Sequence, residues 1–377
     1  MKKFKFLECR CCTSKDIKLW LDFKHTPIAN LITPNPIFTK YPLSVYYCEL
    51  CGHLQLHEVP DPANVFIDYR YMSGVSSSFR DHFGKLAKSI VAKYGKGNLL
   101  EIGSNDAFLL NEFKNNGCDV VGIEPSLHFN NFYSKYGITL INDFFTSDVI
   151  NRFSLENKFD IICANNVMAH VPDSFELINN ISKTLKNEGI LVAECGDQLG
   201  ILNGEYIDNV YHEHIDYYSP YSFSKLAERV NLYVEDVLPI NTHGRSFRII
   251  CKKKNTNYPF NKSLFSYSEA SIYVSNLFKV RRQRILNSIN GEKFIAYGAA
   301  AKSVTSLYSL ELTGYLKGVV DDNPLKQGMY FPGTSIKIQN SENLDKNATI
   351  LVTAWNLFEE IKAKLLLNNH IGKIVCM

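Results

Sequence analysis

The chain has 377 residues, of which 45% are hydrophobic and 21% are charged, and its formal net charge is +3. This length exceeds what one hydrophobic core usually serves, so we expect two or three domains. The balanced charge excludes a strong electrostatic attraction to nucleic acid or to a membrane surface. No apolar run reaches the roughly 18 residues of a membrane-spanning helix, and the first residues lack an apolar leader, so we expect a cytoplasmic protein.

Four of the ten cysteines stand in two close pairs near the N-terminus. Cys9 and Cys12 form one C-x-x-C pair, and Cys48 and Cys51 form the other. Two such pairs can bring four thiolates together tetrahedrally around zinc, with Zn–S distances of about 2.3 Å. Because cysteine fills all four positions, this zinc is expected to be structural. The alternatives are two local disulfides, free thiols, or Cys11 in place of Cys12.

The composition divides the chain into three blocks. Residues 1–85 hold the cysteine pairs and many prolines, and they predict a small zinc-binding module held together by something other than a core. Residues 86–263 alternate strand-like and amphipathic runs, which predicts a parallel sheet with crossover helices. The strands expected there are 98–102, 120–124, 159–164 and 190–194, and the helices are 107–115 and 173–186.

Residues 264–377 begin with one long helix that ends near residue 290, and a second α/β alternation follows. The basic run 280–284 on that helix is interpreted as a solvated face. The elements expected after it are strands 294–297, 316–321 and 349–354 and a helix 356–367. The fold class is therefore α/β, with a zinc-binding N-terminal module, a central Rossmann-like domain and a C-terminal Rossmann-like α/β domain.

A glycine turn follows the first predicted strand of the central domain. Gly103 lets a ligand approach the backbone there, and Glu124 comes about 20 residues later, as a ribose-binding carboxylate does. The turn is not G-x-G-x-x-G, so a dinucleotide is disfavoured, and S-adenosylmethionine fits better. The plain alternative is a domain that uses the glycine only for its turn. The cofactor-binding residues expected are Glu101, Gly103, Asn105, Asp106, Glu124, Asn165 and Asn166.

Histidine, tyrosine and glutamate are concentrated in three segments, 68–73, 165–172 and 211–218. By spacing alone His212 and His214 could bind a metal, but no third ligand accompanies them and the string is not H-E-x-x-H. A lone histidine is more often structural than catalytic. Several histidines at predicted strand ends favour a functional role.

Several strings, in order along the chain, resemble those of one family. They are Glu101–Asp106, Gly122–Pro125, Asn165–Asp173, Tyr211–His214, Thr242–Gly244, Ala296–Lys302 and Val320–Gly328. With the cysteine module, they make the chain resemble the sugar C-methyltransferases of deoxysugar biosynthesis over essentially its whole length. The resemblance implies a zinc module, a class I S-adenosylmethionine-dependent methyltransferase domain and a C-terminal domain. The last would contact the nucleotide end of a nucleotide-linked 4-keto-6-deoxysugar.

By this resemblance His214 is the general base, and the other active-site groups are Tyr71, His170, Tyr211 and Glu213. A ring carbon beside a ketone becomes a nucleophile only after it loses a proton, and histidine titrates near working pH. Tyr211 or Tyr71 could then donate to the ketone oxygen, and Glu213 could orient a histidine. The expected reaction is methyl transfer to a ring carbon, with C-3 as the expected position.

The residues expected to contact the substrate are Tyr69, His243, Arg245, Lys302 and Asp321. Lys302 opens a helix after a small-residue turn, where a phosphate can bind. The alternative is that the C-terminal domain binds no ligand and only packs against the rest of the protein. The chain departs from the family pattern at Asp197, Arg245 and Ser303, which leaves the sugar and its stereochemistry open.

Two other functions stay open on sequence alone. An O- or N-methyltransferase on the same scaffold needs no proton abstraction beside a ketone. A non-catalytic, zinc-stabilised binding protein would not bind S-adenosylmethionine. The expected partner is a small molecule, with no nucleic acid and no membrane, and the expected state is a monomer or a weak homo-oligomer.

Overall fold

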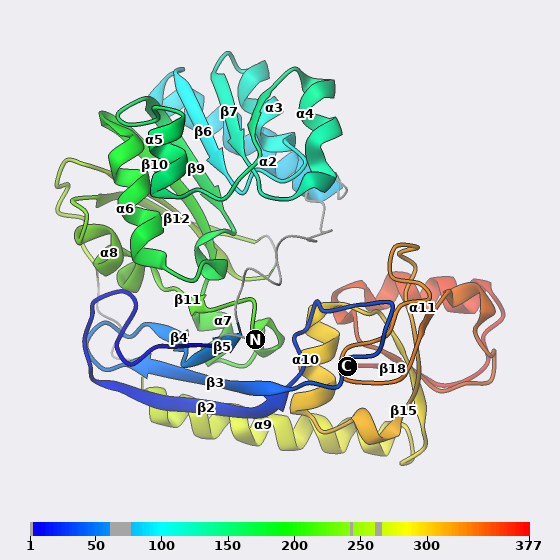
Figure 1. Cartoon of the computed structure of the whole chain (residues 1–377). Coiled ribbons are helices and arrows are strands. Elements are labelled where there is room, and N and C mark those ends of the chain that lie inside the picture. Colours follow the sequence, from blue (N-terminus) through cyan, green and yellow to red (C-terminus); the bar gives the residue numbers. More distant parts are fainter. Residues whose placement is uncertain (1–2, 61–76, 242–243, 261–265) are drawn as a thin grey trace.

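The computed structural model describes residues 3–60, 77–241, 244–260 and 266–377. Tyr69, Tyr71 and His243, which the sequence assigns to the active or substrate site, lie outside these residues. The described chain forms three lobes, with the central lobe above an N-terminal sheet and the C-terminal lobe to the side (Figure 1).

The N-terminal lobe is built on a four-stranded antiparallel sheet with the order β11-β4-β3-β2. Its strands are β2 (Ile17–Thr26), β3 (Tyr41–Cys48), β4 (Leu54–Leu56) and β11 (Asp216–Tyr217); β1 (Lys3–Lys5) pairs separately with β5 (Glu58–Pro60). Trp20, Leu43 and Leu54 pack in one cluster with Val274 of α9 (Tyr267–Ser288). The lobe therefore has a core, contrary to expectation, because α9 and β11 arrive from distant parts of the chain to complete it.

The central lobe holds a seven-stranded sheet with the order β12-β13-β10-β9-β6-β7-β8. Its strands are β6 (Asn98–Ile102), β7 (Asp119–Ile123), β8 (Thr139–Ile141), β9 (Phe159–Asn165), β10 (Leu185–Gly196), β12 (Tyr233–Ile240) and β13 (Ser246–Lys252). β13 pairs antiparallel with β10 and with β12, and the other neighbouring strands of this sheet are parallel. The chain order reverses between β6 and β9, and ligands of open α/β sheets bind at the carboxyl ends of the strands at such a point.

The helices of this lobe cover the sheet. They are α2 (Ser77–Tyr94), α3 (Phe108–Asn115), α4 (Asn130–Tyr136), α5 (Ser147–Arg152), α6 (Ser174–Thr184) and α8 (Pro220–Glu228). Helix α7 (Leu199–Leu202) instead packs into the core of the N-terminal lobe (Figure 1). The strands and helices predicted between residues 98 and 194 are all present, with ends displaced by a few residues. Uninterrupted apolar runs such as Ile161 and Ile162 marked the buried strands, since both faces of a parallel sheet are covered.

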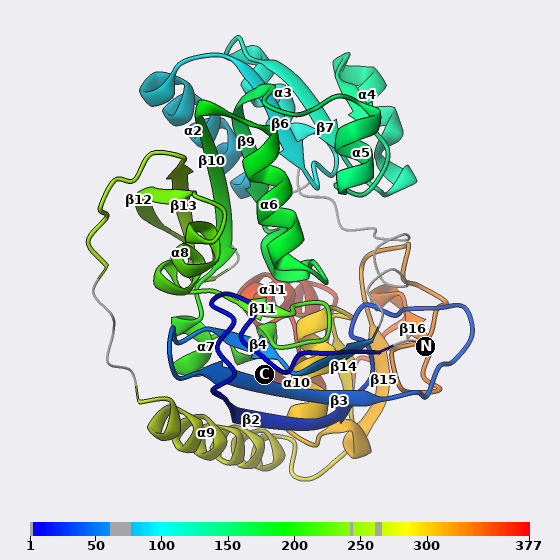
Figure 2. The ribbon, with the colours of Figure 1, turned by 60° about the vertical axis from the view of Figure 1, so that its left-hand side comes forward.

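The C-terminal lobe has a parallel sheet with the order β16-β15-β14-β17-β18. Its elements are β14 (Phe294–Tyr297), α10 (Ala301–Ser309), β15 (Leu316–Val320), β16 (Ile338–Gln339), β17 (Ile350–Val352), α11 (Phe358–Leu367) and β18 (Ile374–Cys376). Helix α9 lies along the N-terminal sheet, as both ribbon views show (Figures 1 and 2). It buries Val274 in that lobe and Ile285 in the C-terminal core, so one helix ties the two lobes together.

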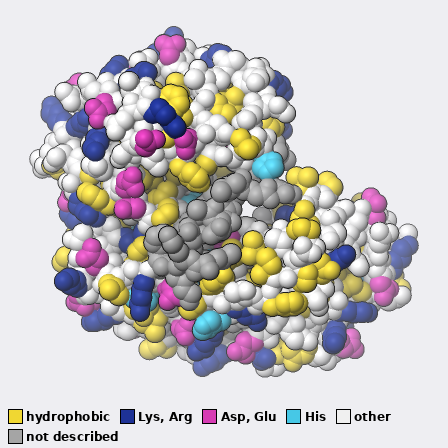
Figure 3. All heavy atoms as spheres, in the orientation of Figure 1, with side chains coloured by type: hydrophobic (Ala, Val, Ile, Leu, Met, Phe, Trp, Pro, Cys, Tyr) yellow, Lys and Arg dark blue, Asp and Glu magenta, His cyan; other side chains and the backbone are white. Residues whose placement is uncertain are grey.

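The face of the molecule in Figure 3 carries scattered charges of both signs, and no single-sign patch is visible on it. Among the described helices, none has the length and apolar character needed to cross a membrane.

Candidate active site

The four cysteines of the two pairs converge in the N-terminal lobe. All four Sγ atoms lie within 4.8 Å of one another, with Cys9 3.5 Å from Cys51 and Cys12 3.5 Å from Cys48. Zn–S bonds of about 2.3 Å place thiolates about 3.8 Å apart, so this cluster fits one zinc ion. Cys11 is buried outside the cluster, which agrees with the C-x-x-C assignment. All ten cysteines are described and none is in a disulfide.

The glycine turn lies at the carboxyl end of β6, where the sheet order reverses. Gly103 has a φ of +63°, and a Cβ there would lie 2.8 Å from Cγ2 of Val167, so glycine is required. The Glu124 carboxylate, beyond β7, accepts hydrogen bonds from the N–H groups of Asn105 and Ser126, both at 2.9 Å. The turn and the predicted ribose-binding carboxylate are thus held together.

Unsatisfied polar atoms cluster at the same crevice. Glu101 is 5% exposed, and its Oε2 has no hydrogen-bond partner among the described residues. The side-chain oxygen and nitrogen of Asn165, at the end of β9, also find no partner in the described chain. Buried polar atoms are rarely left unsatisfied, so a polar ligand completes this crevice. Asp106 is buried in the turn, and Asn166 turns the chain after β9 with a φ of +56°.

Tyr211 and His214 form a hydrogen-bonded pair. Nδ1 of His214 lies 2.8 Å from the carbonyl oxygen of Asn209, and Nε2 lies 2.8 Å from the Tyr211 hydroxyl. A carbonyl only accepts, so Nδ1 carries the proton and the lone pair of a neutral ring is on Nε2. Asn209 ends the short helix η4 (Ile207–Asn209). The backbone thus selects the tautomer that leaves Nε2 basic.

His170 lies beside this pair. It ends the short helix η3 (Met168–His170), which follows the cofactor crevice at β9, and its ring centroid is 4.7 Å from that of His214. Its Nδ1 donates to the carbonyl oxygen of Glu213 at 2.7 Å. Burial lowers the pKa of His170, so its ring is neutral at neutral pH. The N–H of Ile215 donates to Ala169 at 2.7 Å, which joins the two segments.

The Glu213 carboxyl group is 3% exposed, and its Oε1 accepts a hydrogen bond from the N–H of Asn30 at 2.8 Å. Its Oε2 has no partner among the described residues, and burial raises the pKa of this carboxyl group. The backbone oxygen of Glu213 orients His170, and an active-site role for its carboxyl group stays a prediction. His212, by contrast, contacts the carbonyl of Pro42 at 3.1 Å, and burial lowers its pKa to about 4, so it is structural.

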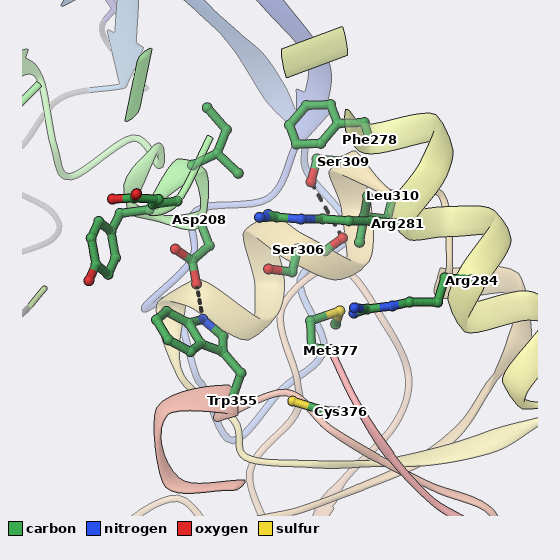
Figure 4. Close-up of a pocket in the computed structure, with 13 residues that line it drawn as sticks. Asp208, Phe278, Arg281, Arg284, Ser306, Ser309, Leu310, Trp355, Cys376 and Met377 are labelled. Carbon is green, nitrogen blue, oxygen red and sulfur yellow. Dashed lines mark hydrogen bonds between the residues drawn. The ribbon is translucent and has the colours of Figure 1, made fainter. Parts of the chain in front are cut away.

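A cavity of about 380 Å³ lies between α9, α10 and η4 (Figure 4). Arg281 and Arg284 reach into it from α9, facing Trp355 and Asp208. The indole N–H of Trp355 donates to Oδ2 of Asp208 at 2.6 Å, while Oδ1 has no partner among the described residues. Nζ of Lys302 lies 5.8 Å from the Trp355 ring. The cavity therefore combines cations, an aromatic face and a buried hydrogen-bond acceptor.

One expectation for the C-terminal lobe changes with this geometry. The basic run 280–284 is a solvated face only in part: Val280 is 65% exposed, but the two cavity arginines of the run point inward. Both carboxylate oxygens of Asp321 accept protein hydrogen bonds, from the N–H groups of Ala299 and Asn323. Asp321 therefore holds the loop before α10, and its contact with the substrate stays a prediction.

Arg245 forms an ion pair with Asp197, with Nε 2.7 Å from Oδ2. Two of the three residues at which the chain departs from the family pattern are therefore paired with each other. The Arg245 side chain is about half exposed, so the pair lies at the surface.

Comparisons with known proteins cover all three lobes. Residues 9–66 match a family described as a putative zinc binding domain, and residues 78–237 match one described as a methyltransferase domain. Residues 278–377 match the family described as a C-methyltransferase C-terminal domain. The chain is also 28% identical to the C-methyltransferase NovU of Streptomyces niveus over 384 residues, which covers 94% of this chain and 91% of that protein.

These matches follow one another along a single chain, and a C-methyltransferase is aligned with nearly all of it. These matches identify the chain as an S-adenosylmethionine-dependent C-methyltransferase. Solved methyltransferase structures resemble this C-methyltransferase only weakly. One from Thermotoga maritima, described as a possible histamine N-methyltransferase, is 17% identical, covers 46% of this chain and 91% of that one, and has a TM-score of 0.37. The 1,6-didemethyltoxoflavin-N1-methyltransferase of Burkholderia thailandensis is 11% identical. Its match covers 56% of this chain and 99% of that one, with a TM-score of 0.38.

Some features of this C-methyltransferase carry no signal in the sequence. The carbonyl of Asn209 orients His214, but any residue type can supply a backbone oxygen. Asp208 and the two cavity arginines become neighbours only when η4 packs beside α9. A sequence pattern could have found one clue, since Arg281 and Arg284 are three residues apart and share a helix face.

Binding of S-adenosylmethionine by this C-methyltransferase should release protons and strengthen as the pH rises. Burial, followed by the charges of Asp106 and Glu124, raises the pKa of Glu101, and burial also raises that of Glu124. An ionised carboxylate is the better acceptor for ribose hydroxyls, so the complex binds fewer protons than the free enzyme. Calorimetry in two buffers of different ionisation enthalpy measures this release. Glu101→Gln should reduce it, and equal apparent enthalpies for the wild type in both buffers would contradict the prediction.

Proposed function

We propose that this enzyme methylates a ring carbon, C-3, of a nucleotide-linked 4-keto-6-deoxysugar. The observation that carries the proposal is the Tyr211–His214 pair, because it combines a histidine of defined tautomer with a hydroxyl donor. Both groups are needed to turn a carbon beside a ketone into a nucleophile. S-adenosylmethionine, when bound at the crevice of Gly103 and Glu124, supplies the electrophilic methyl group.

The proton of the acceptor carbon passes to His214 in this proposal. Its Nε2 already accepts a hydrogen bond, and Asn209 stabilises the protonated ring that forms, since Nδ1–H donates more strongly when the ring is charged. The deprotonated carbon shares its negative charge with the ketone oxygen. That oxygen therefore needs a hydrogen-bond donor at the moment the proton leaves.

Tyr211 supplies this donor by changing partners. Its single proton points to Nε2 of His214 in the described structure, so it serves one acceptor at a time. Rotation of the hydroxyl from Nε2 to a ketone oxygen would free the histidine lone pair and place the donor in one movement. His170, neutral and fixed by the carbonyl of Glu213, forms the wall behind His214.

In this proposal the nucleotide end of the sugar substrate binds in the cavity lined by Arg281, Arg284 and Trp355. The arginines suit phosphate oxygens, the indole offers a stacking face, and Oδ1 of Asp208 can accept from a base or ribose. Asp208 directly precedes Asn209, so an occupant of the cavity would lie next to the element that orients His214. This proximity favours one extended acceptor spanning both places.

Arg284→Gln should raise the KM for the sugar nucleotide about ten- to a hundredfold, because it loses a charge-assisted hydrogen bond worth about 1.5–3 kcal/mol. The affinity for S-adenosylmethionine should stay unchanged. Arg282→Gln is the matched control, since Arg282 lies on the same helix, pairs with Glu311 at 3.9 Å and does not line the cavity. Equal KM values for the two variants would show that the cavity does not bind the sugar nucleotide.

The proposed function is tested with a panel of nucleotide-linked 4-keto-6-deoxysugars, S-adenosylmethionine and purified enzyme. The expected product is 14 mass units heavier, about one methylene, and nuclear magnetic resonance places the new methyl group on C-3. Incubation in D₂O should exchange the proton of that carbon. Methylation of sugars that lack a ketone would instead support an O- or N-methyltransferase. The cytoplasm is the proposed compartment, since reducing conditions keep the four zinc thiols available.

A further inference from the structure

A buried arginine inside the first zinc knuckle reaches the two segments that carry the active-site histidines. Arg10 lies between Cys9 and Cys11, and its side chain is 6% exposed. Its guanidinium donates to Val171 O at 2.8 Å and to Pro172 O at 2.7 Å, directly after His170. The same group therefore touches the backbone of the first histidine segment.

The other edge of the guanidinium binds Asp216, two residues after His214. Nε of Arg10 lies 2.8 Å from Oδ1 of Asp216 and Nη2 lies 2.9 Å from Oδ2, so the pair is bidentate. Asp216 is fully buried, and its Oδ1 also lies 2.9 Å from Nε2 of His53, which follows the second knuckle. Residues in or next to both zinc knuckles thus bind the Asp216 carboxylate, which lies in the segment 211–218 that carries His214.

We infer that Arg10, which lies in the zinc module, is a positioning residue that fixes the distance between His170 and His214. The inference rests on the roles proposed for these two histidines. Arg10 is anchored at its own backbone as well, since its N–H donates to Oε1 of Gln55 at 2.9 Å. A zinc ion bound by the four thiolates would close the knuckle that carries this arginine, and the ring centroids of His170 and His214 lie 4.7 Å apart.

The side-chain chemistry explains why the position needs arginine. One planar group serves two carbonyls and a carboxylate in different directions, which uses most of its five N–H donors. Lysine carries the same charge but offers three donors from a single point, so it cannot make both sets of contacts. A misplacement of about 1 Å between catalytic groups can cost about a hundredfold in rate.

Arg10→Lys tests the inference in the full-length, zinc-loaded enzyme. We expect bound zinc and the affinity for S-adenosylmethionine to be retained, while kcat falls about ten- to a hundredfold. Carbon–proton spectra of enzyme labelled at the histidine rings should show shifted signals for His170 and His214, assigned with single replacements of each. Arg229→Lys is the control: Arg229 contacts the same knuckle, donating to Arg10 O at 3.2 Å and Cys11 O at 3.3 Å. Its ring signals and kcat should match the wild type.

The ring signals need no acceptor, so they decide the inference even if the sugar panel yields no product. Wild-type ring signals and kcat in a zinc-containing Arg10→Lys enzyme would overturn it. If that variant loses zinc, Asp216→Asn replaces it, because this change keeps the side-chain volume, leaves the Arg10 contacts to Val171 and Pro172 in place, and weakens the contacts of the carboxylate with Arg10 and His53. Shifted His214 signals in that variant support the inference, and unshifted signals refute it.

Discussion

Replacing His214 by glutamine should lower methyl transfer by about 10²–10⁴-fold, the usual contribution of a positioned general base. Glutamine keeps a donor for the Asn209 carbonyl but has no lone pair of comparable basicity. Exchange of the acceptor proton in D₂O should fall in parallel, because it reports the same proton transfer. The affinity for S-adenosylmethionine should be unchanged, since Gly103 and Glu124 lie directly beyond β6 and β7 and not in the histidine segment.

His212→Gln is the matched control for this experiment. His212 lies two residues away, but its ring contacts the carbonyl of Pro42 instead of Tyr211. Its loss should affect stability more than turnover per folded molecule. Normal turnover in the His214 variant, or a loss of equal size in both variants, would show that His214 is not the base.

Replacing Cys48 by serine should weaken zinc binding and destabilise the N-terminal lobe. A structural zinc site stabilises the fold by its binding free energy, and a thousandfold weaker site loses about 4 kcal/mol. The thermal transition of the lobe should therefore fall by about 15–30 °C. Metal analysis, with one zinc per chain expected for the wild type, and calorimetric melting curves measure the two effects.

Cys11→Ser separates the two possible cysteine sets. Cys11 is buried beside the first knuckle, but its sulfur is not part of the four-thiol cluster. The variant should keep its zinc and melt close to the wild type. If it lost zinc while a Cys12→Ser variant kept it, the ligand assignment would be wrong.

The metal site and the cofactor turn were accessible from sequence because their chemistry is local. Each cysteine pair forms its own knuckle, so the fold had only to bring two preformed halves together. Gly103 and Glu124 each stand directly beyond a strand, and parallel strands place their carboxyl ends at one edge. Spacing alone therefore predicted that these residues meet.

The histidine segments were accessible only in part. The resemblance singled out His170, Tyr211 and His214, and the hydrogen bond between Tyr211 and His214 spans just three residues. The partner atoms that set their chemistry are backbone oxygens of Asn209 and Glu213, which no residue pattern marks. The role of the Glu213 carboxyl group stays a prediction.

The residue types and their spacing by themselves determined the α/β class, the four zinc ligands and the glycine turn, since each depends on neighbours within a few residues. Tertiary structure decided what lies around the reacting groups. Arg10 meets Asp216 across 206 residues, and α9 carries two arginines into a cavity shared with Trp355. Contacts of this kind depend on how whole lobes pack, and packing follows from the summed burial of many side chains and not from any one motif.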